Sequence, residues 1–353
     1  MQFFGQGRAN LGVLFDSDMG ASPDSALALA LLFGLEGKNE ARVVSLSVSR
    51  HNLKSAAYCE AVRGFYASAT NPQVRGFFRN LPVGMSTQGK MVDDTPMLVA
   101  PLSKPGAEGK PAYEHSIEKL NDTADVAALI RNALTAQIDE NAVIVVAGPA
   151  TNIVATLSLP GVKELAAKKV RTLVWAAGVY PTGGPEPRIQ ADVAAAKKLA
   201  AEWPGSLIAC GAEVGDALGY PAASIEKDFA WTPNHPVVDA YTAYKAMPYD
   251  APSPALAAVL QAVRPKENYF KLSEPGTIEV GDDGRTRFSE STQGKHRHLI
   301  VDQAQKERVL EAYTSIVSAK PVPRQPRFRP PQDQQQQAPP PKPAEVKPPA
   351  KTP

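Results

Sequence analysis

Residues 11–37 read LGVLFDSDMGASPDSALALALLFGLEG, and this stretch decides the fold. The apolar run 11–15 is typical of a buried strand, and residues 25–35 carry the pattern of a buried helix that ends at glycines. The loop between them contains three aspartates, Asp16, Asp18 and Asp24. A strand that enters a helix through a polar loop is typical of a parallel α/β sheet, which binds ligands beyond the carboxyl ends of its strands.

Strand and helix patterns continue to alternate along the chain. The expected strands are 43–48, 142–147, 170–175 and 207–210, and the expected helices between them are 52–66, 124–138 and 193–203. Residues 67–121 hold many Gly and Pro residues and are predicted to be loops. The expected C-terminal elements are helices 237–244 and 256–263, a hairpin of strands 277–280 and 286–288, and a last helix 302–318. We therefore predict one α/β domain over residues 1–320, with a mainly parallel sheet, helices on both faces, and a C-terminal hairpin and helix.

The last 33 residues, 321–353, differ in composition from the rest. They contain 12 prolines and a Gln334–Gln337 run, which predicts a disordered tail that leans toward polyproline II. This tail is either a spacer or the ligand of a proline-recognising partner. The tail carries a net charge of +4. Because the formal net charge of the whole chain is +2, residues 1–320 carry a net charge of −2. No basic field for nucleic acid is expected.

Other compositional features exclude some classes of protein. The two cysteines, Cys59 and Cys210, lie in apolar context and are predicted to be buried thiols and not a disulfide. No apolar run is long enough for a membrane span, so we expect no membrane partner. Residues 1–10 lack the apolar core of a signal peptide, which favours a cytoplasmic protein as written. A leader lost upstream of residue 1 would make it periplasmic or secreted.

Two polar turns follow predicted strands and carry the candidate chemistry. Three carboxylates within residues 16–24 repel one another unless a cation, a shared proton or strong donors offset their charge. Asp24 or Ser25 as a helix N-cap explains only part of this cluster. The second turn, Gly148-Pro-Ala-Thr-Asn152, presents carbonyls and an amide at the end of strand 142–147.

Together these turns resemble the nucleoside hydrolase family, whose first loop has the form Asp-x-Asp-x-Gly-(insert)-Asp-Asp-Ala and whose later turn reads Gly-Pro-Leu-Thr-Asn. The resemblance is to a bacterial branch and covers about residues 11–318. Further matching segments are Gly183–Asp192, Glu202–Pro204, Gly211–Gly215, Ala262–Pro265 and the terminal hairpin.

The resemblance implies a role for each matching residue. Family members hold one calcium ion that binds the ribose diol and a water molecule, and an aspartate activates this water. Asp18 matches the residue that is both metal ligand and base, and Thr151 matches the carbonyl ligand. The ligand-binding positions of the family correspond to Asp16, Asp24, Asn152, Glu186 and Arg188.

Three positions depart from the family pattern. Ser25 and Ala255 stand where two calcium-ligating aspartates are expected, and Arg188 stands where a ribose-binding asparagine is expected. Calcium affinity falls toward roughly millimolar when few carboxylates remain, so we expect a vestigial site with weak or no calcium binding. Two functions stay open. One is hydrolysis of the N-glycosidic bond of nucleosides or related ribosyl compounds with weakened or lost activity, and the other is an inactive binding or scaffold protein.

Arg188 suggests what replaces the metal. Its guanidinium is always charged and can fork onto a carboxylate, so it could bridge Asp18 and Asp24; alternatively it points to solvent. His296 and His298 are predicted to lie on a solvated face, and no dinucleotide or protease motif is present. The partners that we expect are a nucleoside or ribosyl ligand and further copies of the chain.

Overall fold

The structure, a computed structural model, describes residues 10–68, 81–181 and 183–322. The strands are β1 (Leu11–Ser17), β2 (Ala41–Val48), β3 (Val83–Met85), β4 (Ala142–Ala147), β5 (Val170–Trp175), β6 (Leu207–Ala209), β7 (Phe270–Leu272), β8 (Gly276–Val280), β9 (Thr286–Glu290) and β10 (His296–Val301). The α-helices are α1 (Pro23–Gly37), α2 (Leu53–Ser68), α4 (Pro96–Ser103), α5 (Val126–Thr135), α6 (Thr151–Leu157), α7 (Val162–Lys169), α8 (Pro187–Ala191), α9 (Val193–Glu202), α10 (Ala212–Ala217), α11 (Ala222–Lys227), α12 (Pro236–Tyr244), α13 (Pro254–Val263) and α14 (Lys306–Val317). The predicted tail lies almost wholly outside the described residues.

The strands form one sheet in the order β3-β2-β1-β4-β5-β6-β10-β8-β9, with β7 paired to β10. All neighbours from β3 to β10 are parallel, and β8, β9 and β7 add antiparallel pairs at the far end. Strands β2 and β3 are added on one side of β1, and β4, β5 and β6 are then added on its other side. The predicted α/β class, with its C-terminal hairpin and helix, is confirmed.

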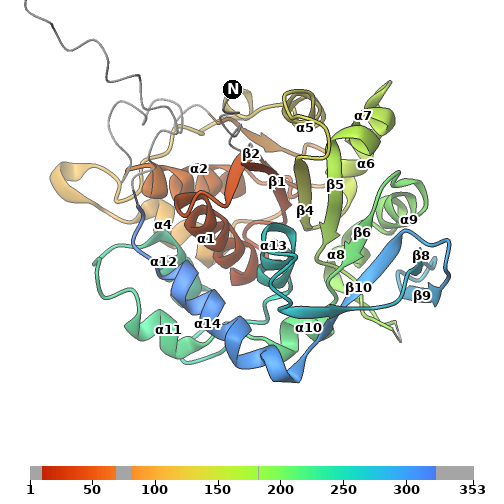
Figure 1. The fold of residues 1–353 in the computed structure, drawn as a ribbon. Coiled ribbons are helices and arrows are strands. Elements are labelled where there is room, and N and C mark those ends of the chain that lie inside the picture. The colour runs from red at the N-terminus through yellow and green to blue at the C-terminus, as the bar shows by residue number, and fades with distance from the viewer. Residues whose placement is uncertain (1–9, 69–80, 182, 323–353) are drawn as a thin grey trace, which may run out of the picture.

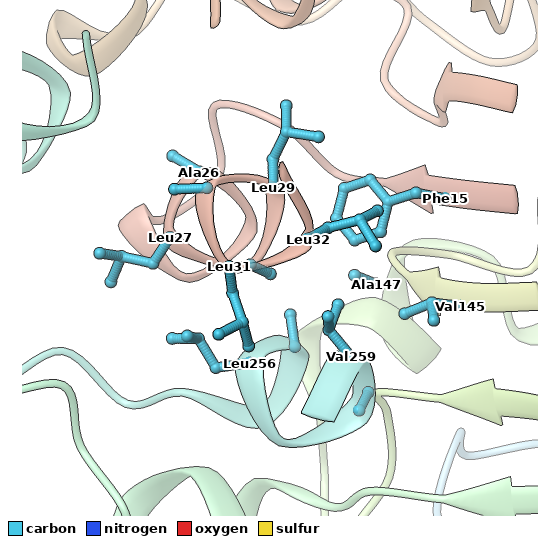
Figure 2. Packing of buried hydrophobic residues seen from close by; sticks show 14 of the residues in the cluster. Phe15, Ala26, Leu27, Leu29, Leu31, Leu32, Val145, Ala147, Leu256 and Val259 are labelled. Carbon is cyan, nitrogen blue, oxygen red and sulfur yellow. The ribbon is translucent and has the colours of Figure 1, made fainter. Parts of the chain in front are cut away.

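Helices cover both faces of the sheet (Figure 1). One apolar layer joins α1, α2, α12, α13 and α14 to the sheet, and a second joins α5, α6, α7 and α9 to its other face. Helix α1 is buried on nearly all sides, which fits its almost continuous apolar sequence. Figure 2 shows its leucines between Phe15 of β1 and Leu256 and Val259 of α13. This packing fixes where the first aspartate loop enters the helix.

Several element boundaries follow from local capping. Asn52 was expected to begin a helix, and its Oδ1 accepts a hydrogen bond from the Ser55 backbone N at 2.9 Å. Helix α5 begins later than predicted, because Asp125 Oδ1 accepts from the Ala128 N at 2.7 Å and so caps it. Both cysteines are buried free thiols, as predicted.

The prediction of loops over residues 67–121 was wrong at two elements of its described part, and residues 69–80 lie outside the described residues. Strand β3 and helix α4 lie within it, and Pro96 occupies the first turn of α4, where a missing N–H costs nothing. The following segment is fixed to α12, because Lys104 Nζ and Tyr113 Oη both contact the Asp239 carboxylate. Gly and Pro here mark helix starts and turns, and long-range polar contacts order the chain between them.

The prediction of a solvated face at His296 and His298 was also wrong. Both residues belong to β10 and are more than nine-tenths buried. His296 Nδ1 accepts from the Ile278 N at 3.0 Å, and the His298 ring stacks on Tyr180. Burial lowers the pKa of both imidazoles. In the part of the chain that the structure covers, no helix is both long and apolar enough to cross a membrane.

Candidate functional site

The predicted aspartates gather at the carboxyl end of β1, where the strand order reverses between β1 and β4. Asp16 and Ser17 end β1, and they pair with Val146 and Ala147 at the end of β4. In open parallel sheets this edge is where side chains from both halves converge on a ligand. The turn after β4 lies against the first loop, since a Cβ at Gly148 would meet the Asp18 backbone N at 2.7 Å. Glycine is needed for this close approach.

Asp16 is held by two donors on one of its oxygens. Ser47 Oγ and Asn152 Nδ2 donate to Asp16 Oδ1 at 2.5 and 2.7 Å. The other oxygen, Oδ2, is buried and has no hydrogen-bond partner. Burial raises the pKa of Asp16 to about 7, against the lowering effect of the two hydrogen bonds. Asp16 is therefore a buried acid that can change its charge near neutral pH.

Arg188 bridges the other two aspartates. Its Nε lies 2.9 Å from Asp18 Oδ2, and its Nη2 lies 2.9 Å from Asp24 Oδ2. Its Nη1 donates to the Ala176 carbonyl at 3.0 Å, so every guanidinium nitrogen has an acceptor. The bridging alternative is confirmed, and the solvent-facing alternative was wrong. Burial works to lower the pKa of Arg188, but the charges of Asp18 and Asp24 outweigh it, so the pKa is raised.

The remaining oxygens of the bridged carboxylates also have donors. Ser25 Oγ donates to Asp18 Oδ1 at 2.7 Å. The Ala255 N lies 3.1 and 3.0 Å from the two oxygens of Asp24, and the Leu256 N approaches Oδ1 at 3.4 Å. These amides open α13, so Asp24 sits at a helix N-terminus, where negative charge is stabilised. Burial raises the pKa of Asp24, whereas the Arg188 guanidinium and the Ala255 amide lower it.

Glu186 positions the arginine. It is the N-cap of α8, where its Oε2 accepts from the Ile189 N at 3.0 Å and from the Gly178 N at 3.3 Å. Pro187 follows at the first helical position, and Arg188 comes next. Burial raises the pKa of the Glu186 carboxyl. These contacts fix the short helix that carries the guanidinium to the aspartates.

Thr151 and Asn152 occupy the start of α6, beyond β4. Asn152 joins the cluster through Asp16, whereas Thr151 Oγ1 donates to Asp192 Oδ2 at 2.6 Å. Asp192 also caps α9 through the Ala195 N. The structure ties the side chain of Thr151 to Asp192 at the start of α9. It brings together Asp16, Asp18, Asp24, Ser25, Asn152, Arg188 and the backbone of Ala255.

The cluster has one further member, Ser47, which was not among the predicted site residues. Ser47 lies directly beside Asp16 in the parallel register of β1 and β2. A search for polar residues at the carboxyl end of the second predicted strand would have found it, because adjacent parallel strands end at the same edge. Ser47 lies within the predicted strand 43–48, whose mostly apolar sequence indicates a buried strand and not a site.

The bridged part of the cluster is nearly closed to solvent. The side chains of Asp18, Asp24 and Arg188 are only 11%, 3% and 7% exposed. Asp18 is the aspartate with the most contact with solvent in this bridge. In the part of the chain that the structure describes, no three His, Cys, Asp or Glu side chains are arranged to hold a metal ion. Chemically, the arrangement is a buried carboxylate network in which one guanidinium offsets part of the negative charge, and burial raises the pKa of both Asp16 and Asp24.

Comparisons with known proteins bear on the fold. No family model matches the sequence, and no curated protein matches it. Among solved structures, a plant nucleoside hydrolase is similar, with a TM-score of 0.63, 18% identity, and coverage of 88% of this chain and 99% of that one. A purine-preferring ribonucleoside hydrolase from Gardnerella vaginalis is similar with a TM-score of 0.62 and 16% identity, and the match covers 87% of this chain and 98% of that one. The type III effector protein XopQ, solved in complex with adenosine diphosphate ribose, is similar with a TM-score of 0.60 and 14% identity, and the match covers 88% of this chain and 94% of that one. This chain therefore has the nucleoside hydrolase-like fold.

Proposed function

We propose that this chain, which has the nucleoside hydrolase-like fold, has lost calcium-dependent cleavage of nucleosides and acts as a binding protein. The observation that carries the proposal is the Arg188 guanidinium, which lies 2.9 Å from an oxygen of both Asp18 and Asp24. One positive side chain already forms ion pairs with both carboxylates that the resemblance assigns to calcium and ribose. This is the inactive alternative left open by the sequence.

The residues present do not fit a calcium ion. Calcium takes roughly six to eight oxygen ligands at about 2.3–2.6 Å. Both oxygens of Asp18 and both of Asp24 instead accept hydrogen bonds from protein N–H or O–H donors. Position 25 supplies a hydroxyl that donates, and position 255 supplies only a methyl group and an amide. A divalent cation would also be repelled by the adjacent guanidinium, so we derive no catalytic step through a metal.

The ligand class that we propose is a nucleoside or another ribosyl compound. Two of the similar structures are nucleoside-cleaving enzymes by name, and XopQ was solved with adenosine diphosphate ribose. Asp18 is the aspartate of the bridged pair that such a ligand would contact, because its side chain is more exposed than that of Asp24. This ligand class follows from likeness of fold, and a direct binding assay tests it.

A second candidate is hydrolysis of a ribosyl substrate without a metal, and Asp16 favours it. Its Oδ2 has no hydrogen-bond partner, and burial raises its pKa to about 7. A group with a pKa near the working pH is suited to take a proton from an attacking water. Against this role, Asp16 is only 1% exposed. We therefore place it second.

One set of assays on the full chain separates these functions. We would measure release of base from inosine, uridine and adenosine, and of nitrophenol from nitrophenyl riboside, with added calcium and with a chelator. We expect no turnover in either condition, and a thermal shift with adenosine or adenosine diphosphate ribose. Turnover that requires calcium would overturn the proposal. Turnover that survives the chelator and disappears in Asp16→Asn would favour the second candidate.

A further inference from the structure

A cavity of 650 Å³ is lined by the start of α2 and by residues of the segment 91–103, and we call it the α2–α4 cavity. Leu53 and Ala57 of α2, Leu102 of α4 and Ile117 form its apolar base. Helices α2 and α4 lie side by side (Figure 1). Among the described residues that line the cavity, none belongs to the carboxylate cluster. Its volume is within the range of about 300–1,000 Å³ that is usual for pockets that hold small molecules.

One wall of the cavity is apolar and exposed. Met91 is 75% exposed, Val92 and Val99 are each 38% exposed, and all three line the cavity. Several large apolar side chains seldom lie together in water unless the patch binds something. The unbranched thioether of Met91 can adapt its shape to a ligand, and its sulfur packs favourably against an aromatic ring. The wall is therefore suited to the apolar body of a ligand.

The segment that carries Met91 and Val92 is held in place by α2 and the residue before it. Asn52 is only 4% exposed, and its Nδ2 donates to the Val92 carbonyl and to Asp94 Oδ1 at 3.0 Å each. The Val92 N donates to the His51 carbonyl at 3.2 Å. The backbone of the wall is thus fixed by hydrogen bonds before a ligand arrives, so binding loses little entropy in ordering it.

The rim of the cavity is negatively charged. The titratable side chains among its described lining residues are Asp93, Asp94, Glu118, His115 and Lys54. The Lys54 ammonium is already paired with the Asp94 carboxylate. Within the described part of the chain, the exposed carboxylates of Asp93 and Glu118 form neither an ion pair nor a side-chain hydrogen bond. The complement of two unpaired carboxylates beside an apolar wall is a cation with an apolar body.

We propose that the α2–α4 cavity binds a small organic cation with an apolar, preferably aromatic, body. The body packs on Met91 and Val99, and the cationic group lies at the rim by Asp93 and Glu118. A partner protein fits less well, because a stable protein interface takes about 20–30 residues a side, whereas this wall offers three exposed apolar side chains. The proposal is independent of the function proposed for the carboxylate cluster, because the two sites share no described residue.

Methionine-methyl NMR of the full chain tests binding at the cavity. The Met91 methyl, assigned through Met91→Leu, reports on the wall, and Met247, which is not among the described lining residues, is the internal reference. Three probes with the same apolar body differ in charge at neutral pH: 4-phenylbutylamine, 4-phenylbutanol and 4-phenylbutyrate. We expect the amine to shift the Met91 methyl saturably, with a Kd of about 5 mM or tighter, as is usual for a ligand of this size.

The charge of the probe should decide its affinity. We expect the butyrate to bind at least about fivefold more weakly than the amine, with the alcohol between them, because charges at an exposed rim are partly screened. High salt should reduce this ratio, since it screens the rim further. An equal effect of all three probes would show that only the apolar wall matters, and would overturn the choice of a cation.

Three variants separate the rim from the wall. Asp93→Asn with Glu118→Gln removes two charges and keeps the wall, so the ratio of amine to butyrate affinity should fall below about twofold. Glu226→Gln with Asp228→Asn is the matched control, because it removes two exposed acids outside the described lining and should leave the ratio unchanged. Val99→Ser should weaken all three probes alike by at least about threefold, because it removes apolar contact area.

Other results would overturn the proposal. One is the absence of any saturable shift of the Met91 methyl with the amine, and another is an unchanged ratio in the variant of Asp93 and Glu118. A dimer in analytical ultracentrifugation that Met91→Ser dissociates would show that a second copy covers the wall instead. Binding of a peptide of alternating leucine and lysine, without any response to the amine, would assign the cavity to a partner protein and would also overturn the proposal.

Discussion

Replacing Arg188 with asparagine, the residue expected at this position from the family resemblance, should destabilise the fold in a way that can be calculated from its contacts. The change removes two ion pairs of 2.9 Å and the hydrogen bond to the Ala176 carbonyl. All three charged side chains are nearly closed to solvent, so water cannot replace the lost partner. Breaking a buried ion pair in this way costs about 3–5 kcal/mol.

Two features of the site reduce that cost. Asp24 keeps the amides of Ala255 and Leu256, and Asp18 keeps the Ser25 hydroxyl. Asp24 can also take up a proton, since burial already raises its pKa. We therefore expect Arg188→Asn to lower the free energy of unfolding by about 1–3 kcal/mol at neutral pH.

Urea unfolding of the full chain, followed by circular dichroism, measures this loss. Arg264→Asn is the matched control, because it breaks an ion pair with Glu40 that is partly open to solvent and should cost less than about 1 kcal/mol. In the Arg188 variant the folded-state pKa of Asp24 rises further, and a raised acid pKa removes stability as the pH rises. The deficit should therefore grow from pH 5 to pH 8. A loss no larger than that of the control, or one independent of pH, would refute the bridging role.

Two further perturbations test other parts of the structure. Burial raises the pKa of Asp16 to about 7, so the stability that its protonation contributes is present below the unfolded-state pKa and is lost as the pH rises through 7. The free energy of unfolding of Asp16→Asn, measured in urea, should therefore rise relative to that of the wild type between pH 5 and pH 8. A difference that stays constant over this range would contradict the prediction. Deleting residues 321–353 should lower the melting temperature by no more than about 3 °C, because a segment with so many prolines and so few apolar residues is expected to bury little surface. A fall of about 10 °C or more in differential scanning calorimetry would show that the tail packs as part of the domain.

Much of the site could be predicted because its chemistry is local in the sequence. The aspartate loop and the Gly-Pro-Ala-Thr-Asn turn both follow apolar strands, and parallel strands bring such turns to one edge. The departure at Arg188 was informative because a guanidinium, where the family pattern has an asparagine, can supply positive charge to the remaining aspartates. The geometry in which Arg188 contacts both Asp18 and Asp24 bears this out.

Other parts depend on contacts between distant segments and left no local pattern. The amide of Ala255 reaches Asp24 from 231 residues away, and only the packing of α13 on α1 places it there. His296 and His298 are polar in sequence, yet pairing of β10 with β6 and β8 buries them. Residues 86–118 owe their order to side-chain contacts with α2 and α12, such as that of Lys104 with Asp239. Local composition cannot report such tertiary contacts.

The most direct test of the central claim, that Arg188 stands in place of a bound calcium ion, is calorimetric titration of calcium into two full-length proteins. The wild type should show no saturable binding below about the millimolar range expected for sites with few carboxylates. The triple variant Ser25→Asp, Ala255→Asp, Arg188→Asn restores two carboxylates and removes the cation, and it should bind one calcium ion at least about tenfold more tightly. One-site micromolar binding by the wild type would contradict the claim, and so would a triple variant that folds but binds calcium no better.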